Sequence, residues 1–262
     1  MKNIRKFRKW QVFLFILLMT LMLGSIVTPA ADKKKSKYAR KSYTGWELSG
    51  DKQYFRKKGK RVYGWRLING KYYYITKKRG VWKNRIAGDR PGRYFYVDAN
   101  GARVTDPQIM QAVSLIKSCS KGSQGARMRL YMCFRRLCTY DYSWFPDYPS
   151  AYAMPGYADH TFRVKIANCW RYGAAMAYCA RCLGYDSKVT IGGVTAYQYR
   201  NLSPHGWCEV LIDGEWYMID VSMQRHHPDA NLFLVKRSEY PYRLRCDNDY
   251  YLTVPYGRAV WM

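Results

Sequence analysis

The sequence predicts an α+β fold, in which a mixed domain at residues 106–262 follows a small β-hairpin repeat module at residues 43–105. The first observation is a repeat with a period of about 20 residues that pairs an aromatic run with a glycine, which is typical of stacked hairpins. The second is an alanine-rich segment that predicts a helix, followed by two alternating apolar segments joined at Asp213-Gly214. Helical and strand signals that are segregated along a chain are typical of the α+β class.

The N-terminus has the layout of a secretory signal. Five basic residues precede an apolar run over residues 12–27, and the small residues Ala30 and Ala31 follow it. As a helix, this 16-residue run would span about 24 Å, short of a hydrocarbon core of about 30 Å. We therefore expect residues 1–30 to be a signal peptide that touches the membrane only transiently, with an uncleaved anchor as the alternative. Residues 31–42, which are rich in lysine and lack an apolar pattern, predict a flexible basic linker.

Residues 43–104 contain three copies of a hairpin-like unit. Gly45-Trp46 recurs as Gly64-Trp65, whereas the third copy has lost this opening and has Arg85-Ile86-Ala87 in its place. Within each copy, an aromatic run followed by a glycine turn predicts a short hairpin. Such units bury their apolar faces only by stacking on their neighbours.

The segments GWRLINGKYYYITKKRG and RYFYVDANG resemble cell-wall-binding repeats of the choline-binding and glucan-binding type. This resemblance implies that aromatic residues of successive repeats form ligand cages, because ring faces suit quaternary ammonium groups and sugar rings. The alternative is that the same rings form the core of the stack and bind no ligand. The high Lys and Arg content favours an anionic or glycan ligand at least as strongly as choline. The candidate ligand-binding residues are Trp46, Trp65, Tyr74 and Tyr96.

The formal net charge of +27 is concentrated in the repeats and the linker, since residues 31–105 carry 22 basic and 5 acidic residues. This distribution favours contact with anionic surfaces such as cell-wall polymers or lipid head groups, with a merely solvated basic face as the alternative. The export signal argues against a specific nucleic-acid partner as the main function. Duplex binding by this region would be steeply salt-dependent.

The mixed domain opens at Asp106-Pro107, a helix-entry signal. Residues Gln108 to Lys117 and Ala126 to Leu137 predict two helices. Residues 140–157, rich in aromatic side chains and proline, predict a loop. Such a loop either walls a substrate groove or forms packed surface, and the pattern favours neither.

Cys169 opens the alanine-rich helix, for which Asn168 is a cap and Gly184 an end signal. In the first turn of a helix, unpaired backbone N–H groups and the positive end of the dipole stabilise a thiolate, the nucleophilic form of cysteine. A lone cysteine in such a helix is more often a small buried apolar residue. The candidate base and its partner elsewhere in the chain therefore decide the interpretation.

The segment HGWCEVLIDGEWYMIDVSM predicts two strands joined at Asp213-Gly214. Antiparallel pairing about this turn places Leu211 near Glu215 or Trp216 and carries His205 towards residues 220 to 223. The predicted roles are thiolate attack by Cys169, proton transfer by His205 and orientation of the imidazole by Asp220.

These motifs resemble the transglutaminase-like superfamily. The resemblance rests on NCWRYGAAMAYCARCLGY, HGWCEVLIDGEWYMIDVSM and RRLCTYDYSW, and it covers about residues 106–245. It implies a papain-like transglutaminase core, with the cysteine on a helix and the histidine and aspartate on adjacent strands, and it assigns the triad to Cys169, His205 and Asp220. The superfamily includes acyltransferases, peptidases and inactive members, so the resemblance does not select the reaction.

Other candidate groups are weaker. His160 is a rival base, but its segment lacks a strand pattern and a following acidic residue. His226 and His227 lack a second ligand pair, and Cys179-x-x-Cys182 lies inside a predicted helix with no matching pair, so no metal site is expected. With Cys169 reserved, seven cysteines remain, and a core of this size does not require disulfides to fold.

The sequence thus predicts a secreted, surface-retained cysteine acyltransferase or peptidase that acts on amide or peptide bonds without a cofactor. Its expected partners are a protein or peptide substrate and a cell-wall glycan or anionic wall polymer. The backbone N–H of Cys169 is a candidate oxyanion donor, and the sequence identifies no second donor. The alternative is a catalytically inactive wall-binding or interaction protein that retains the fold.

Overall fold

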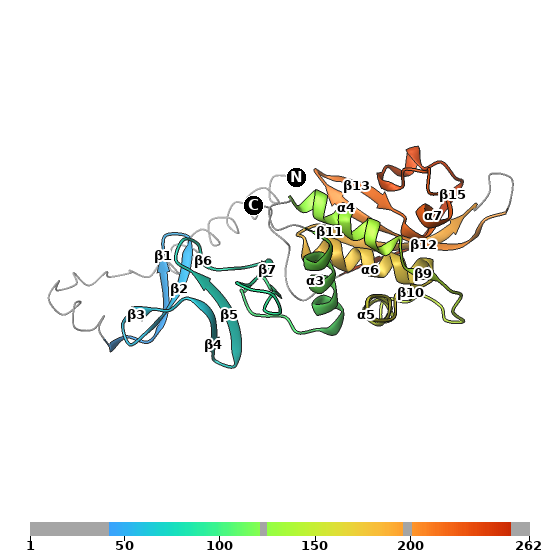
Figure 1. Ribbon diagram of the computed structural model, residues 1–262. Coiled ribbons are helices and arrows are strands. Elements are labelled where there is room, and N and C mark those ends of the chain that lie inside the picture. Colours follow the sequence, from blue (N-terminus) through green and yellow to red (C-terminus); the bar gives the residue numbers. More distant parts are fainter. Residues whose placement is uncertain (1–41, 121–124, 196–200, 253–262) are drawn as a thin grey trace, which may run out of the picture. The chain divides into compact units, whose positions relative to one another are not determined.

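The computed structural model describes residues 42–120, 125–195 and 201–252 (Figure 1). The predicted signal peptide and all but the last residue of the predicted linker lie outside these ranges. Among the described residues, Gly45–Arg56 and residues 61–252 belong to one compact unit, and residues 42–44 with Lys57–Lys60 belong to another. Within the described ranges, no helix is both long and apolar enough to cross a membrane.

Each of the three sequence repeats forms its own small sheet, which confirms the predicted hairpins. Gly80 ends the second repeat with a φ of 70°. A Cβ atom there would lie 2.4 Å from the carbonyl oxygen of Gln53 in the first repeat, so stacking requires glycine at this position. The strands are β1 (Gly45–Ser49), β2 (Lys52–Lys57) and β3 (Lys60–Arg61), then β4 (Gly64–Ile68), β5 (Lys71–Thr76) and β6 (Gly80–Val81), then β7 (Arg85–Ala87) and β8 (Phe95–Val97).

The mixed domain begins with helices. Two of them, α3 (Pro107–Cys119) and α4 (Ala126–Leu137), confirm the helices predicted from Gln108 to Lys117 and from Ala126 to Leu137. The third, α5 (Met154–Val164), was not predicted, and it shortens the expected loop at residues 140–157. The fourth is α6 (Cys169–Cys182).

The mixed domain also contains a five-stranded antiparallel sheet, whose strands lie in the order β14, β13, β12, β11, β15. The predicted hairpin is β12 and β13, and Leu211 faces Trp216 across it as expected. The second predicted strand extends too far, because β13 ends at Ile219 and a short helix begins at Val221. The remaining elements are β9 (Asp141–Tyr142), β10 (Ile166–Ala167), β11 (Asp186–Val194), β12 (Ser203–Ile212), β13 (Glu215–Ile219), α7 (Val221–His226), β14 (Phe233–Val235), the 3-10 helix η1 (Arg237–Glu239) and β15 (Leu244–Tyr251).

Helix α6 is buried on nearly every side and packs on β11 and β12 as well as on α3 and α5. Its alanines give the helix small side chains at many of its buried positions. At Gly173, an added Cβ atom would lie 3.1 Å from the backbone of Trp207, so the helix approaches β12 as closely as glycine permits. Glycine inside a helix costs about 1 kcal/mol relative to alanine. Here it permits the approach that brings the helix start towards the strand carrying His205.

Candidate active site

Cys169 is the first residue of α6, and its side chain is buried with 6% exposure. Asn168 caps the helix as predicted, because its side-chain oxygen accepts the backbone N–H of Arg171 at 3.1 Å. The cap therefore uses the backbone N–H of Arg171 and not the backbone N–H of Cys169. The sulfur and its own backbone N–H lie at the positive end of the helix dipole, where a developing oxyanion is stabilised.

His205 links the cysteine to an acidic group. Its Nε2 lies 2.8 Å from Oδ2 of Asp220, and the side chain of Cys169 lies close enough to the imidazole to raise its pKa. Since Nε2 faces the carboxylate, Nδ1 is the ring nitrogen left for the sulfur. Burial of His205 disfavours its charged form, but the negative charges of Asp220 and Cys169 outweigh burial and raise its pKa to about 10.

Asp220 is fully buried at the end of β13 and caps α7. Its Oδ1 accepts the backbone N–H of Met223 at 2.9 Å, and its Oδ2 accepts the hydroxyl of Tyr240 at 2.7 Å as well as the imidazole. Burial alone would raise the pKa of this carboxyl, but the charge of His205 and these hydrogen bonds lower it. The structure thus brings the three predicted triad residues together and adds Tyr240, which the sequence did not reveal.

We expect Tyr240→Phe to lower kcat by about tenfold, because removal of one hydrogen bond to a buried charge costs about 1.5 kcal/mol or more. The carboxylate would hold the imidazole less firmly, so the pH profile of turnover should shift as well. Tyr242→Phe is the matched control, since Tyr242 packs against Tyr240 at 5.6 Å between ring centroids. Equal kcat values and pH profiles for wild type and Tyr240→Phe would contradict this positioning role.

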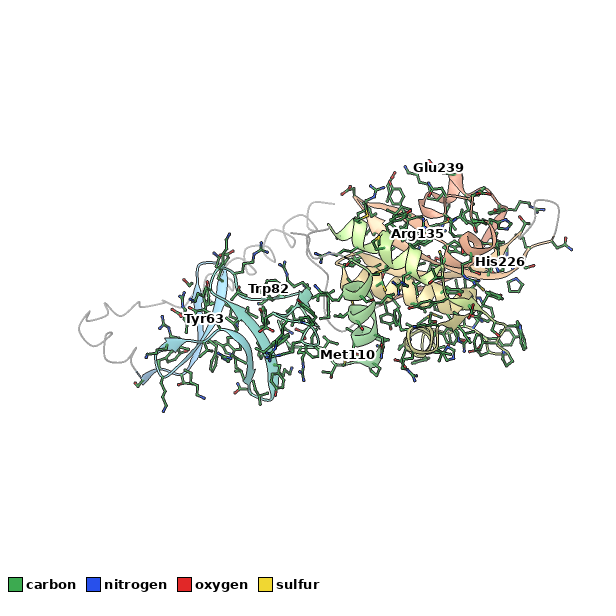
Figure 2. All side chains as sticks on the ribbon, viewed as in Figure 1. Tyr63, Trp82, Met110, Arg135, His226 and Glu239 are labelled. Atoms are coloured by element: carbon green, nitrogen blue, oxygen red, sulfur yellow. The ribbon has the colours of Figure 1, made fainter. Side chains whose placement is uncertain are left out.

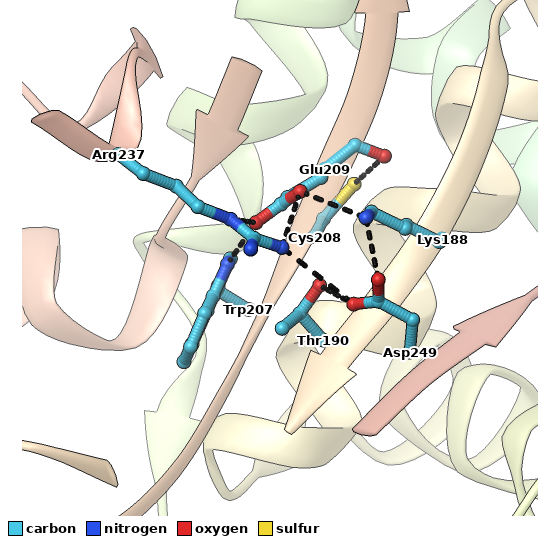
Figure 3. A network of polar contacts seen from close by, with 7 residues as sticks. All are labelled: Lys188, Thr190, Trp207, Cys208, Glu209, Arg237 and Asp249. Atoms are coloured by element: carbon cyan, nitrogen blue, oxygen red, sulfur yellow. Dashed lines mark hydrogen bonds and ion pairs between the residues drawn. The ribbon is translucent and has the colours of Figure 1, made fainter. Parts of the chain in front are cut away.

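The face of β12 that carries His205 is stiffened by a charged network (Figure 3). The indole of Trp207 stacks near the imidazole, with 6.1 Å between centroids and 24° between planes, and it donates to Oε1 of Glu209 at 2.8 Å. Glu209 is fully buried and also accepts both Nε and Nη2 of Arg237, at 2.7 and 3.0 Å. Lys188 lies between Glu209 and Asp249, at 3.3 and 2.7 Å. Two acids and two bases leave this network neutral, which limits the cost of burial.

Cys169 opens onto a cavity of about 580 Å³. One side is formed by aromatic residues and prolines of the segment at residues 142–149, as the loop prediction allowed. The other side includes Ile191, Gly192 and the polar residues Arg245 and Asn248. A cavity of this size accommodates a short stretch of an extended chain beside the sulfur.

Arg171 attaches the aromatic wall of this cavity to the catalytic helix. It lies two residues after Cys169, and its guanidinium forms a two-point ion pair with Asp147 at 3.0 and 2.8 Å. Its charge also lies 3.7 Å from the ring centroid of Phe145 and 4.4 Å from that of Tyr157. The hydrogen bonds from Arg171 lower the pKa of Asp147. Arg171 therefore holds the wall in place relative to the sulfur.

We expect Arg171→Lys to raise KM about tenfold while kcat changes little, because lysine keeps the charge but lacks the planar fork that holds Asp147. Substrate binding depends on the wall, whereas the chemical step depends on Cys169 and His205. Arg163→Lys is the matched control, since Arg163 pairs with Asp159 on the exposed side of α5. A fall in kcat at constant KM would contradict this assignment.

The other candidate residues from the sequence make different contacts. His160 packs against the ring of Phe145 at 5.4 Å, and burial lowers its pKa. His226, labelled in Figure 2, packs against Tyr142, and His227 packs against Tyr242. Among the described residues, no group of three or more His, Cys, Asp or Glu side chains could hold a metal ion. All eight cysteines are free thiols, with Sγ atoms of Cys119 and Cys133 at 3.6 Å.

The predicted ligand-binding rings of the repeats pack mainly on one another. Trp65 and Tyr74 are each 9% exposed, with 5.2 Å between their ring centroids, and Trp46 contacts Tyr73 at 5.0 Å. Tyr96 is 1% exposed and belongs to the buried cluster that includes residues of α3. Ring packing is thus the role visible here. A ligand role for Trp46, Trp65, Tyr74 and Tyr96 stays a prediction.

Several solved structures are similar to parts of the chain. A TGase is 20% identical, with 44% of this chain and 31% of that chain covered and a TM-score of 0.34. The periplasmic domain of TgpA from Pseudomonas aeruginosa is 18% identical, with 48% and 45% covered and a TM-score of 0.35. The choline binding domain of a Streptococcus pneumoniae protein is 26% identical, with 24% and 77% covered and a TM-score of 0.22. The chain spans under a third of the TGase chain.

No curated protein matches the chain. The sequence model of the transglutaminase-like superfamily matches residues 111–221. This range begins within α3 and includes Cys169, His205 and Asp220. The chain therefore carries a domain of the transglutaminase-like superfamily at residues 111–221.

Proposed function

We propose that this protein is a secreted, surface-retained cysteine enzyme that acts on amide or peptide bonds through an acyl-enzyme on Cys169. The observation that carries the proposal is the position of His205, whose imidazole is hydrogen-bonded to Asp220 and lies close enough to Cys169 for that side chain to raise its pKa. A raised histidine pKa beside a thiol at a helix start favours an ion pair of thiolate and imidazolium. Such a pair supplies a nucleophile and a proton donor in one step.

In the proposed reaction, the thiolate of Cys169 attacks the carbonyl carbon and the carbonyl oxygen becomes an oxyanion. The backbone N–H of Cys169, at the start of α6, stabilises that charge. The imidazolium of His205 then gives its proton to the departing amine, the carbon–nitrogen bond breaks, and a thioester remains. Asp220 keeps the ring oriented throughout, because it is hydrogen-bonded to the imidazole of His205. Tyr240 in turn holds Asp220 through the hydrogen bond that its hydroxyl donates.

Release of the acyl group requires a second nucleophile. Neutral His205 takes a proton from water or from an amine, which attacks the thioester and restores the thiolate. Water gives hydrolysis and an amine gives acyl transfer. The open cavity beside Cys169 admits either acceptor.

Surface retention is proposed for the basic repeats. The signal-like segment at residues 1–30 supports export, and the positive charge of residues 31–105 supports attachment to an anionic wall polymer or glycan. A wall-bound enzyme would meet protein or peptide substrates at the cell surface. The alternative, an inactive binding protein, would use the same repeats without turnover.

The test compares thiol reactivity and turnover in the mature protein. We expect a mild alkylating agent such as iodoacetamide to modify Cys169 faster at pH 6 than any other cysteine, as peptide mapping would show. Peptides with a glutamine or a scissile amide, assayed with and without a primary amine, should then yield hydrolysed or amine-linked products by mass spectrometry. Reactivity of Cys169 equal to that of exposed Cys246, together with no product, would favour the inactive alternative.

A further inference from the structure

The repeats contain another cavity, of about 610 Å³, which the proposed reaction does not use. It is formed by the starts of β2 and β7 and by the segment between β5 and β7. Asp51 is the only acidic residue among the described residues that line it. Five basic residues line the same space, namely Lys52, Lys78, Arg79, Lys83 and Arg85.

Among the residues that the structure describes, these five cations have no carboxylate ion-pair partner. Within the described ranges, no salt bridge joins any of them to a carboxylate. The first repeat shows the contrast, because Glu47 there pairs with both Arg56 and Arg61 at 2.8 Å. The chain therefore pairs two arginines with a carboxylate in the first repeat and leaves the cavity positive.

The cavity also contains an aromatic surface. Trp82, labelled in Figure 2, lines it, and its indole N–H donates to the hydroxyl of Thr76 at 3.2 Å. The guanidinium of Arg85 lies 5.3 Å from the centre of the Trp82 ring, and its Nε donates to the carbonyl of Lys83 at 3.2 Å. Trp82 and Arg85 are thus fixed in place before any ligand arrives, which reduces the entropy lost on binding.

We propose that this cavity binds phosphodiester groups of an anionic cell-wall polymer, with the polyol or sugar units of that polymer against the ring of Trp82. This proposal rests on the proposed surface retention and gives it a site and a ligand class. Arginine guanidinium groups match the geometry of phosphate oxygens, and lysines add charge without fixed direction. A row of cations beside an aromatic face suits a polymer that alternates charged and uncharged units.

The electrostatic surroundings of Arg85 agree with this arrangement. Its pKa is lowered, first by partial burial and then by the positive charge of Arg79. The positive charge of Arg79 therefore acts on Arg85 within this cavity, and a bound phosphate would offset it.

The test uses the full-length mature protein and purified poly(glycerol phosphate) as the probe. We expect Arg79→Glu combined with Lys83→Glu to weaken binding at least tenfold and to release the protein from purified walls. Lys57→Glu combined with Lys71→Glu is the matched control, because both lysines are exposed and lie outside the cavity, and the charge change is the same. This control should bind like wild type at equal ionic strength.

Each of the following outcomes would overturn the proposal: wild-type binding by the cavity variant, an equal loss in the control, undiminished binding to walls stripped of phosphodiester polymer, or equal affinity for polyglutamate. Stronger binding to anionic lipid vesicles than to the polymer would also overturn it and would assign the cavity to a membrane. Turnover of a soluble amide substrate is measured in parallel in every variant. If wild type binds the polymer but shows no turnover, the proposed reaction fails while this site stands.

Discussion

Replacement of Cys169 by alanine is expected to abolish turnover of amide substrates, with a loss in kcat on the order of 10⁴-fold or more. Without the sulfur no acyl-enzyme forms, and the backbone N–H at the start of α6 has no oxyanion to stabilise. Alanine is the best helix former and differs from cysteine by one atom, so the fold should persist. The measurement is kcat together with circular dichroism and the thermal midpoint.

Cys182→Ala is the matched control for this prediction. Cys182 lies at the other end of the same helix and is 2% exposed, so the substitution removes a buried sulfur of α6 without touching the site. Turnover should survive in this variant. Retained turnover in a folded Cys169→Ala variant would show that Cys169 is not the nucleophile.

Loss of the imidazole is expected to cost nearly as much as loss of the sulfur. His205→Ala removes the partner of the thiolate and the proton donor for the leaving amine, so kcat should fall on the order of 10³-fold or more. Asp220→Asn should cost less, because asparagine still caps α7 and only the charge is lost. The double variant of His205 and Cys169 should be no slower than Cys169→Ala alone. Full activity of His205→Ala with inactivity of His160→Ala would contradict the assignment.

Asp220→Asn should also change the pKa of the His205 imidazole. Because Asp220 and Cys169 raise the pKa of His205 to about 10, Asp220→Asn should bring that pKa down towards its ordinary value of 6.5. The ring signals of His205 in NMR spectra, identified by their absence from His205→Ala, report the shift directly. An unchanged titration in Asp220→Asn would mean that the carboxylate does not set the charge of the ring.

The pair also makes stability depend on pH. The pKa of His205 is raised in the folded state, so its contribution is fully present below about pH 6.5 and is lost as pH rises through about 10. The pKa of Asp220 is lowered, so its contribution is present above about pH 3.8 and is lost as pH falls below that value. The stabilisation from the pair is therefore greatest between these limits, and Asp220→Asn should flatten the dependence.

Elements defined by local pattern could be predicted well. The cap at Asn168 and the turn at Asp213-Gly214 specify their own geometry within a few residues, and the structure has both. The turn residues have φ values of 51° and 86°, as a tight hairpin requires. Helix α5 was missed although Met154, Tyr157, Ala158 and Phe162 follow helical spacing and Pro155 lies in its first turn. The prolines and aromatic residues before it directed the interpretation towards a loop.

The end of β13 shows where local pattern fails. The residues after Ile219 continue an apolar alternation, yet the chain turns into α7 because the buried carboxylate of Asp220 accepts the N–H of Met223. The same carboxylate meets Tyr240, 20 residues further along the chain. No spacing in the sequence marks that pair, since it forms only when η1 packs beside the end of the sheet.

By itself, the sequence determined the cysteine at a helix start, the histidine on a strand and the aspartate brought near it by a two-residue turn, because each depends on short-range backbone geometry. Only the tertiary structure decided that Tyr240 braces the aspartate, that Arg171 anchors the cavity wall and that five cations of the repeats share one space. Those arrangements join residues across long stretches of chain. They depend on packing between elements, which sets distances that no local pattern records.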